Sequence, residues 1–149
     1  MYIMCVEDNE TDRDFVTLTL RQQGHEVITF DKASEALQCA WTRKPDVVIT
    51  DFMLPGGPNG LQLARELRQI YADCVIVIVS NHINVAQAAI AVRMGIDDLI
   101  LKPLPVDLGD FLWSAVLHRQ SRLPVLSTHG DTGSLYVDAQ RRLVKWHGH

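Results

Sequence analysis

The sequence lacks an excess of basic charge and any long hydrophobic run. Its 149 residues carry 14 Lys and Arg against 18 Asp and Glu, a formal net charge of −4 at pH 7. This balance gives no overall electrostatic attraction to nucleic acid or to an anionic membrane, so a nucleic-acid role would need a local basic patch. No apolar run approaches the length that spans a bilayer. These absences disfavour a membrane partner.

Cysteine is also scarce, and the cysteines form no pattern. Cys5, Cys39 and Cys74 are odd in number, widely spaced in apolar segments and without a C-x-x-C pair. Small buried hydrophobes in a reducing compartment explain them best. The N-terminus lacks the basic stretch and apolar core of a secretion signal. We therefore expect a cytoplasmic protein.

What the chain does contain is a regular alternation of two patterns. With 47% hydrophobic residues, it can bury one substantial core. Five short runs rich in Val and Ile predict buried strands at 2–6, 26–30, 47–50, 75–79 and 99–101. Between them, apolar residues three or four apart predict amphipathic helices. The predicted fold class is α/β, a doubly wound five-stranded parallel sheet with right-handed crossovers.

Turn residues divide this pattern and mark where it ends. Gly24 and Gly95 follow helical segments at C-cap positions, and Asn59 is a natural N-cap for the third helix. The last helix is predicted over about 107–119, before a polar, Gly-rich stretch. We therefore expect a main domain over 1–120 and a linker and tail over 121–149. Two short runs in the tail, 135–137 and 143–146, could pair as a hairpin, which would be marginally stable alone.

Polar side chains stand at the ends of four predicted strands. They are Glu7 and Asp8, Asp51, Ser80, and Lys102. Because ligands of an open parallel sheet bind beyond the carboxyl ends of its strands, we expect these five to converge. Singly, each has an ordinary explanation as a loop or surface residue. Together, three carboxylates in one cleft repel by about 4 kcal/mol per pair at roughly 4 Å and an effective dielectric near 20, so a cation is needed.

The same residues suggest a reaction. Carboxylate oxygens suit a hard divalent ion, and Mg²⁺ is the usual ion where phosphate is also a ligand. Lys102 supplies a second positive charge for a phosphoryl oxygen, and the Ser80 hydroxyl can donate to another. The set predicts phosphoryl transfer onto the carboxylate of Asp51.

Residues 1–120 resemble the receiver domains of two-component response regulators, the CheY-like domains. The resemblance rests on segments 6–9, 48–55, 59–60, Ser80 and 95–103. It implies a flavodoxin-like (βα)5 fold and phosphorylation of Asp51 by a sensor histidine kinase. It implies a signalling domain rather than an enzyme, apart from self-catalysed phosphotransfer and dephosphorylation. It further implies Asp8 and Asp51 as direct Mg²⁺ ligands, with Glu7 acting through water. The main-chain carbonyl of Met53 would complete the protein ligands.

The chain departs from the family pattern at Leu99. Three residues before the lysine such domains usually carry Tyr or Phe, the aromatic switch that accompanies activation. A receiver that docks without phosphorylation therefore stays an alternative. Related regulators often form homodimers through an arginine in the last helix, where Ser114 stands here, so the dimer mode is open.

The tail carries a second resemblance. Residues 133–146 are similar to the β-segment that opens winged-helix effector domains of the OmpR type, without the recognition helix. This similarity implies the front part of a transcription regulator. Such a chain would reach DNA only through an effector domain that is incomplete here.

Two enzymatic alternatives use related arrangements. A flavin- or nucleotide-binding protein would need a Gly-rich loop after the first strand, where Glu7 and Asp8 would repel phosphate. A phosphatase of the haloacid dehalogenase kind carries a second Asp two residues after its nucleophile, and here that position is Met53. The receiver interpretation is therefore preferred.

Overall fold

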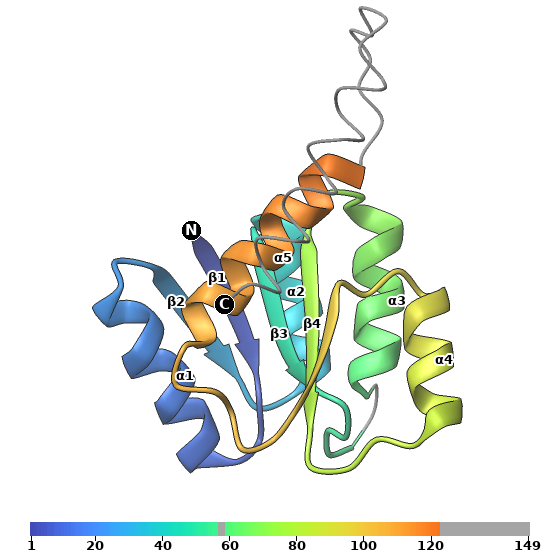
Figure 1. Cartoon of the computed structure of the whole chain (residues 1–149), viewed down its shortest axis with the longest axis horizontal. Coiled ribbons are helices and arrows are strands. Elements are labelled where there is room, and N and C mark those ends of the chain that lie inside the picture. Colours follow the sequence, from blue (N-terminus) through green and yellow to red (C-terminus); the bar gives the residue numbers. More distant parts are fainter. Residues whose placement is uncertain (57–58, 123–149) are drawn as a thin grey trace, which may run out of the picture.

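Five strands and five helices alternate along the part of the chain that the structure describes (Figure 1). The structure is a computed structural model, and it describes residues 1–56 and 59–122. The elements are β1 Tyr2–Val6, α1 Glu10–Gln22, β2 Glu26–Phe30, α2 Ala33–Thr42, β3 Val47–Asp51, α3 Gly60–Ile70, β4 Val75–Ser80, α4 Val85–Arg93, β5 Asp98–Leu101 and α5 Leu108–Arg122. The predicted tail hairpin lies outside the described residues, and α5 continues two residues past the expected boundary at 120.

The five strands form one parallel sheet in the order β2-β1-β3-β4-β5. From β1 the chain adds β2 on one side and then β3, β4 and β5 on the other, so the strand order reverses between β1 and β3. Ligands of doubly wound sheets bind at this point. In the register of the central strands, Val6 lies opposite Thr50, and Asp51 lies opposite Val79. The predicted α/β fold class is confirmed.

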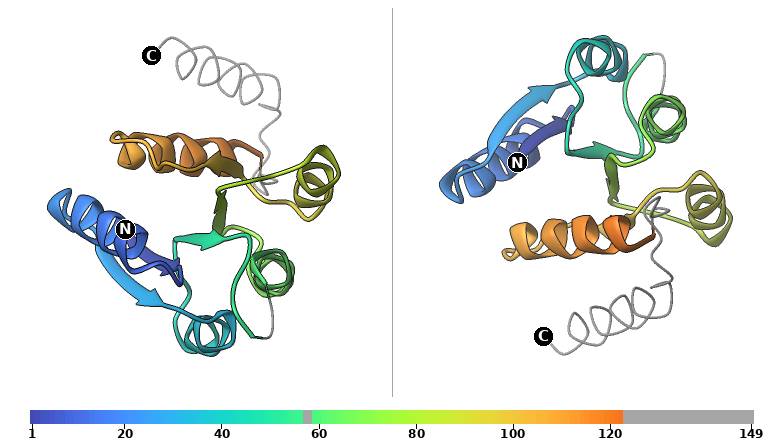
Figure 2. Two further views of the ribbon diagram at one scale, coloured as in Figure 1. Left: turned by 90° about the horizontal axis from the view of Figure 1, so that it is seen from below. Right: turned by 90° about the horizontal axis from the view of Figure 1, so that it is seen from above.

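Helices cover both faces of the sheet. Seen along the strands, α1 and α5 lie on one face, and α2, α3 and α4 lie on the other (Figure 2). Successive strand residues point to opposite faces, so Met4 and Val48 join the core under α2 to α4, while Ile3 and Ile49 join the core under α1 and α5. Two buried faces explain why the central strands are apolar except near their carboxyl ends, where Thr50, Asp51 and Ser80 lie.

Caps and glycines fix how the chain enters and leaves the helices. The side chain of Asn9 caps α1, and Asn59 forms a reciprocal capping box with Gln62 at the start of α3. Gly24 and Gly95 have φ of 88° and 81° after α1 and α4, a left-handed conformation that favours glycine. The three expectations at Asn59, Gly24 and Gly95 are confirmed.

The cysteines are free thiols in the core or beside it. Cys5 and Cys74 are buried and Cys39 is half-buried. Burial raises the pKa of the Cys5 and Cys74 thiols to about 12, so both stay protonated at neutral pH.

Across the described ranges, no helix combines the length and the hydrophobicity that crossing a membrane requires.

Candidate functional site

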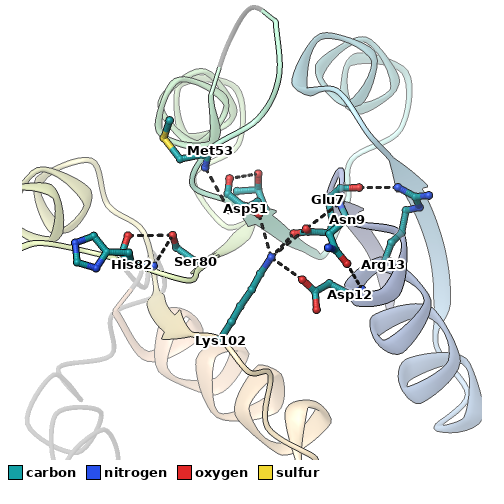
Figure 3. Close-up of polar contacts among 10 residues, drawn as sticks. Glu7, Asn9, Asp12, Arg13, Asp51, Met53, Ser80, His82 and Lys102 are labelled. Atoms are coloured by element: carbon teal, nitrogen blue, oxygen red, sulfur yellow. Dashed lines mark hydrogen bonds and ion pairs between the residues drawn. The ribbon is translucent and has the colours of Figure 1, made fainter.

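The carboxyl ends of β1, β3 and β5 bring the candidate residues together (Figure 3). Glu7 directly follows β1, Asp51 is the last residue of β3, and Lys102 directly follows β5. In doubly wound sheets ligands bind in a crevice beyond the carboxyl ends, where the strand order reverses. These residues lie at that crevice. The peptide bond between Lys102 and Pro103 is cis.

Lys102 connects the acids of the crevice. Its Nζ donates to Glu7 Oε1 and Oε2 at 3.0 and 3.1 Å, and to Asp51 Oδ2 at 3.1 Å. A third carboxylate, Asp12 Oδ2, accepts from the same nitrogen at 2.8 Å. Burial lowers the pKa of Lys102, but the three carboxylates together raise it above the ordinary value. The lysine is therefore a fixed positive charge, and only 6% of its side chain is exposed.

Glu7 is the most deeply buried acid of the group. Burial raises its pKa to about 7, the charge of Asp51 contributes to the rise, and the bond from Lys102 opposes it. The backbone N–H of Asn9 donates to Glu7 Oε1 at 3.1 Å, and the Arg13 guanidinium donates to the Glu7 carbonyl at 2.9 Å. The start of α1 thus holds Glu7 in place from both its side chain and its main chain.

Asp51 is buried but reachable, with 8% of the residue exposed. Its Oδ1 accepts from the backbone N–H of Met53 at 3.2 Å, while Oδ2 faces Lys102. Glu7, Asp8 and Asp51 each place a carboxylate oxygen within 4.8 Å of the others, and such a cluster could hold a metal ion. Carboxylates outnumber the lysine here, so the crevice attracts a further cation.

The remaining predicted residues lie around this centre in different ways. Ser80 is buried at the end of β4, and its hydroxyl donates to the His82 carbonyl at 3.1 Å and accepts from the His82 N–H at 3.3 Å. Met53 has its main chain beside Asp51 and its side chain in solvent. Leu99 is half-buried and packs against the core under α2 to α4. The crevice therefore contains Glu7, Asp8, Asp51 and Lys102, with Ser80 turned toward His82.

Two residues of this edge were missed by sequence reasoning. Asp12 and Arg13 lie in the first turns of α1, where an acid and a base look like ordinary helix-end residues. The available signal was the position of α1, which begins shortly after Glu7 and so places its first turn at the same edge of the sheet. Asp12 is the more informative of the two, since it contacts the lysine directly.

A doubly wound sheet with clustered acids and a buried lysine at its carboxyl edge has the architecture of a phosphoryl-accepting signalling domain. Comparison with known families agrees, because residues 3–109 match the response regulator receiver domain. The chain therefore belongs to the receiver-domain family of two-component response regulators.

Individual relatives support this assignment. The transcriptional regulatory protein AfsQ1 of Streptomyces coelicolor is 27% identical over 146 residues, which are 98% of this chain and 63% of the relative. The chain thus spans under two thirds of that relative's length. The crystal structure of the receiver domain of NtrX from Brucella abortus is 33% identical, with a TM-score of 0.72 over 77% of this chain and 98% of that one. A CheY-like receiver domain from Methanospirillum hungatei, 20% identical over 82% of this chain and 98% of that one, has the same fold with a TM-score of 0.76.

Proposed function

We propose that Asp51 accepts a phosphoryl group from a sensor histidine kinase, in a reaction that depends on Mg²⁺. The observation that carries this proposal is the contact of one buried lysine with both Asp51 and Glu7, beside three converging carboxylates. A lysine and a divalent ion together balance charge on a group transferred to a carboxylate.

The donor set fits Mg²⁺. Hard divalent ions take oxygen ligands, and Glu7, Asp8 and Asp51 offer carboxylate oxygens close enough to share one ion. Asp8 and Asp51 would bind it directly, Glu7 would act through water, and the carbonyl of Met53 would complete the protein ligands. The bound ion would supply positive charge to the phosphoryl oxygens.

The acceptance step needs a free oxygen on Asp51 and a stabilised phosphoryl group. A carboxylate oxygen of Asp51 attacks phosphorus, a new O–P bond forms, and the bond from phosphorus to the donor breaks, so that the donor's electron pair leaves with the donor. Lys102 stays protonated and binds a phosphoryl oxygen. The Ser80 hydroxyl can donate to another once it turns away from the His82 carbonyl.

The larger protein role follows from the relatives. AfsQ1 is a transcriptional regulatory protein, and we extend that output to this chain, acting in the cytoplasm through an effector domain that residues 121–149 would begin. Homodimerisation belongs to the same proposal, because paired receivers would bring two effector domains to DNA.

A phosphorylation-independent docking receiver is the second candidate. Leu99 favours it, because this side chain is aliphatic and packs into the core under α2 to α4, where an aromatic switch is expected from the family pattern. The two candidates differ in whether Asp51 accepts a phosphoryl group at all.

The test uses acetyl phosphate with Mg²⁺ and intact-mass spectrometry. We expect wild type to gain one phosphoryl mass, Asp51→Asn to gain none, and the exposed Asp14→Asn, which removes an equal charge, to behave as wild type. Full phosphorylation of Asp51→Asn would refute the acceptor assignment. A wild type that never gains the mass would favour the docking receiver.

A further inference from the structure

We propose that Asp12 is a positioning residue that restrains phosphoryl acceptance by holding Lys102 in the resting state. This inference rests on the proposed function of Asp51. Asp12 lies in the first turn of α1, contacts Lys102 at 2.8 Å and has 30% of its side chain exposed. No role for this residue follows from the sequence pattern.

The donors of Lys102 are fully used in the resting structure. An ammonium group has three N–H donors, and the three carboxylates of Glu7, Asp12 and Asp51 accept from it. A phosphoryl oxygen that binds Lys102 must therefore displace one of them. Asp12 is the readiest to leave, because Glu7 is 3% exposed and Asp51 is 12% exposed at its side chain. Water can take the place of Lys102 at Asp12.

The negative charge of Asp12 also disfavours binding of a phosphoryl group at Lys102. Its carboxylate is not in the group of acids whose oxygens converge for a metal ion, which consists of Glu7, Asp8 and Asp51 among the described residues. Among the described residues its ion pair is with Lys102, and its negative charge repels an incoming phosphoryl group that needs the same lysine. Asp12 competes with the phosphoryl group for Lys102 without contributing a metal ligand.

The structure offers a matched control on the same helix. Asp14 lies two residues further along α1 and is exposed, and its side chain makes no hydrogen bond or ion pair with the described residues. Asp12→Asn and Asp14→Asn remove the same charge from the same helix with the same change of shape. Only Asp12→Asn weakens the contact with Lys102, because an amide oxygen still accepts from the ammonium but carries no charge. Asp12→Glu keeps the charge and serves as the conservative rescue.

The experiment compares wild type, Asp12→Asn, Asp12→Glu and Asp14→Asn as full chains. With acetyl phosphate as donor, acetate leaves as the Asp51 oxygen bonds to phosphorus, and the rate of mass gain is followed. After the donor is removed, loss of the group is timed. We expect Asp12→Asn to accept the group roughly three- to fivefold faster, because a partly exposed charge contact changes a rate by about that factor. It should lose the group near the wild-type rate, because Lys102 binds the phosphoryl group both before and during its loss. Asp12→Glu and Asp14→Asn should stay near wild type.

A titration of the resting proteins with Mg²⁺ separates positioning from a merely structural role. Asp12→Asn should bind Mg²⁺ as wild type does or slightly more weakly, while it accepts the phosphoryl group faster. If Asp12 only stabilised the start of α1, its loss would weaken Mg²⁺ binding and slow phosphorylation together, which would overturn the inference.

Failure of the inference differs from failure of the proposed function. If wild type is phosphorylated at Asp51 but Asp12→Asn accepts the group as Asp14→Asn does, Asp12 has no such role. If wild type is not phosphorylated, or Asp51→Asn is phosphorylated equally, the acceptor assignment itself is wrong.

Discussion

The two ends of the sheet carry opposite charge arrangements. At the carboxyl end, one lysine is shared by the three carboxylates of Glu7, Asp12 and Asp51. At the other end, one carboxylate, Asp97, is shared by two arginines. The first arrangement leaves unbalanced negative charge and needs a further cation, whereas in the second the one carboxylate is paired with two cations.

The cluster of Asp97, Arg68 and Arg119, called here the Asp97 cluster, connects helices on the two faces of the sheet. Arg68 comes from α3 and Arg119 from α5, on opposite faces of the sheet, and both reach Asp97 at 3.1 and 2.7 Å. Both also donate to the Gly95 carbonyl at 2.9 Å, and the Ile76 N–H donates to Asp97 at 2.8 Å. Only 2% of the Asp97 side chain is exposed. Removing one partner from such a buried pair is costly, because it leaves an uncompensated buried charge.

The two clusters differ in the way expected of a polar cluster that stabilises the fold and one that takes part in a reaction. In the Asp97 cluster the acid is paired with two arginines, and Arg68 also donates to the carbonyls of Tyr71 at the end of α3 and Cys74 before β4. The Lys102 cluster leaves excess negative charge at an edge that solvent and a donor can reach. Substitutions should therefore separate the two ends, one changing stability and the other changing reactivity.

The largest effect on stability is expected at Asp97. Asp97→Ala leaves two partly buried arginines without a counter-charge and should lower the free energy of unfolding by about 3–5 kcal/mol. Asp73→Ala removes an exposed partner of Lys44 and should cost about 1 kcal/mol or less. Urea denaturation of both variants measures the difference. Equal losses would remove the contrast between the two ends.

A smaller effect is expected where α3 approaches Asp51. A Cβ at Gly60 would lie 2.0 Å from the Asp51 main-chain oxygen, so Gly60→Ala must shift α3 or the end of β3. We expect a loss of about 1–3 kcal/mol and a lower yield of phosphorylation. Gly109→Ala meets only the flexible side chain of Gln23 and should change stability by less than about 1 kcal/mol. Similar results for both variants in thermal unfolding and phosphorylation would show that this close approach is unimportant.

Binding of Mg²⁺ at the carboxyl end of the sheet should stabilise the fold. This gain should not depend on the Asp97 cluster at the other end. With Mg²⁺ at roughly five times its dissociation constant, unfolding should become about 1 kcal/mol less favourable. Asp8→Asn removes a proposed ligand that is exposed, and it should lose most of this gain. Asp14→Asn should keep it. Calorimetric scans with and without Mg²⁺ provide the measurement, and a full gain in Asp8→Asn would argue against the metal set.

Glu7 should give the stability of the metal-free fold a dependence on pH. Its pKa is raised from 4.5 to about 7 by burial, so the folded state binds the proton more tightly than the unfolded state. This group therefore stabilises the metal-free fold below about pH 4.5, and that contribution is lost as the pH rises to about 7. Glu7→Gln should remove this part of the slope in melting temperature between pH 5 and 7. An unchanged slope would show that Glu7 titrates normally.

Much of the fold was predictable because its signals are local. Short runs rich in Val and Ile and bounded by turn residues located all five strands, and both β3 and β4 extend one residue further, to Asp51 and Ser80. The candidate residues followed from their positions at strand ends. In the structure Glu7, Asp51 and Lys102 do meet, while Ser80 is directed to His82.

What could not be predicted depends on contacts between distant segments. Asp12 and Lys102 are 90 residues apart, and Asp97 lies 29 residues from Arg68 and 22 from Arg119. Charged residues on helices are usually solvated, and only the packing of α1, α3 and α5 on the sheet brings these together. Their pairing is a property of the tertiary structure rather than of any local pattern.

The central claim is that the carboxyl end of the sheet accepts a phosphoryl group at one residue. The most direct measurement treats the protein with acetyl phosphate and Mg²⁺, reduces the acyl phosphate with borohydride, and maps the altered residue by peptide mass spectrometry. We predict a single reduced site at Asp51. A reduced site at Glu7, Asp8 or Asp12, with Asp51 unmodified, would contradict the account.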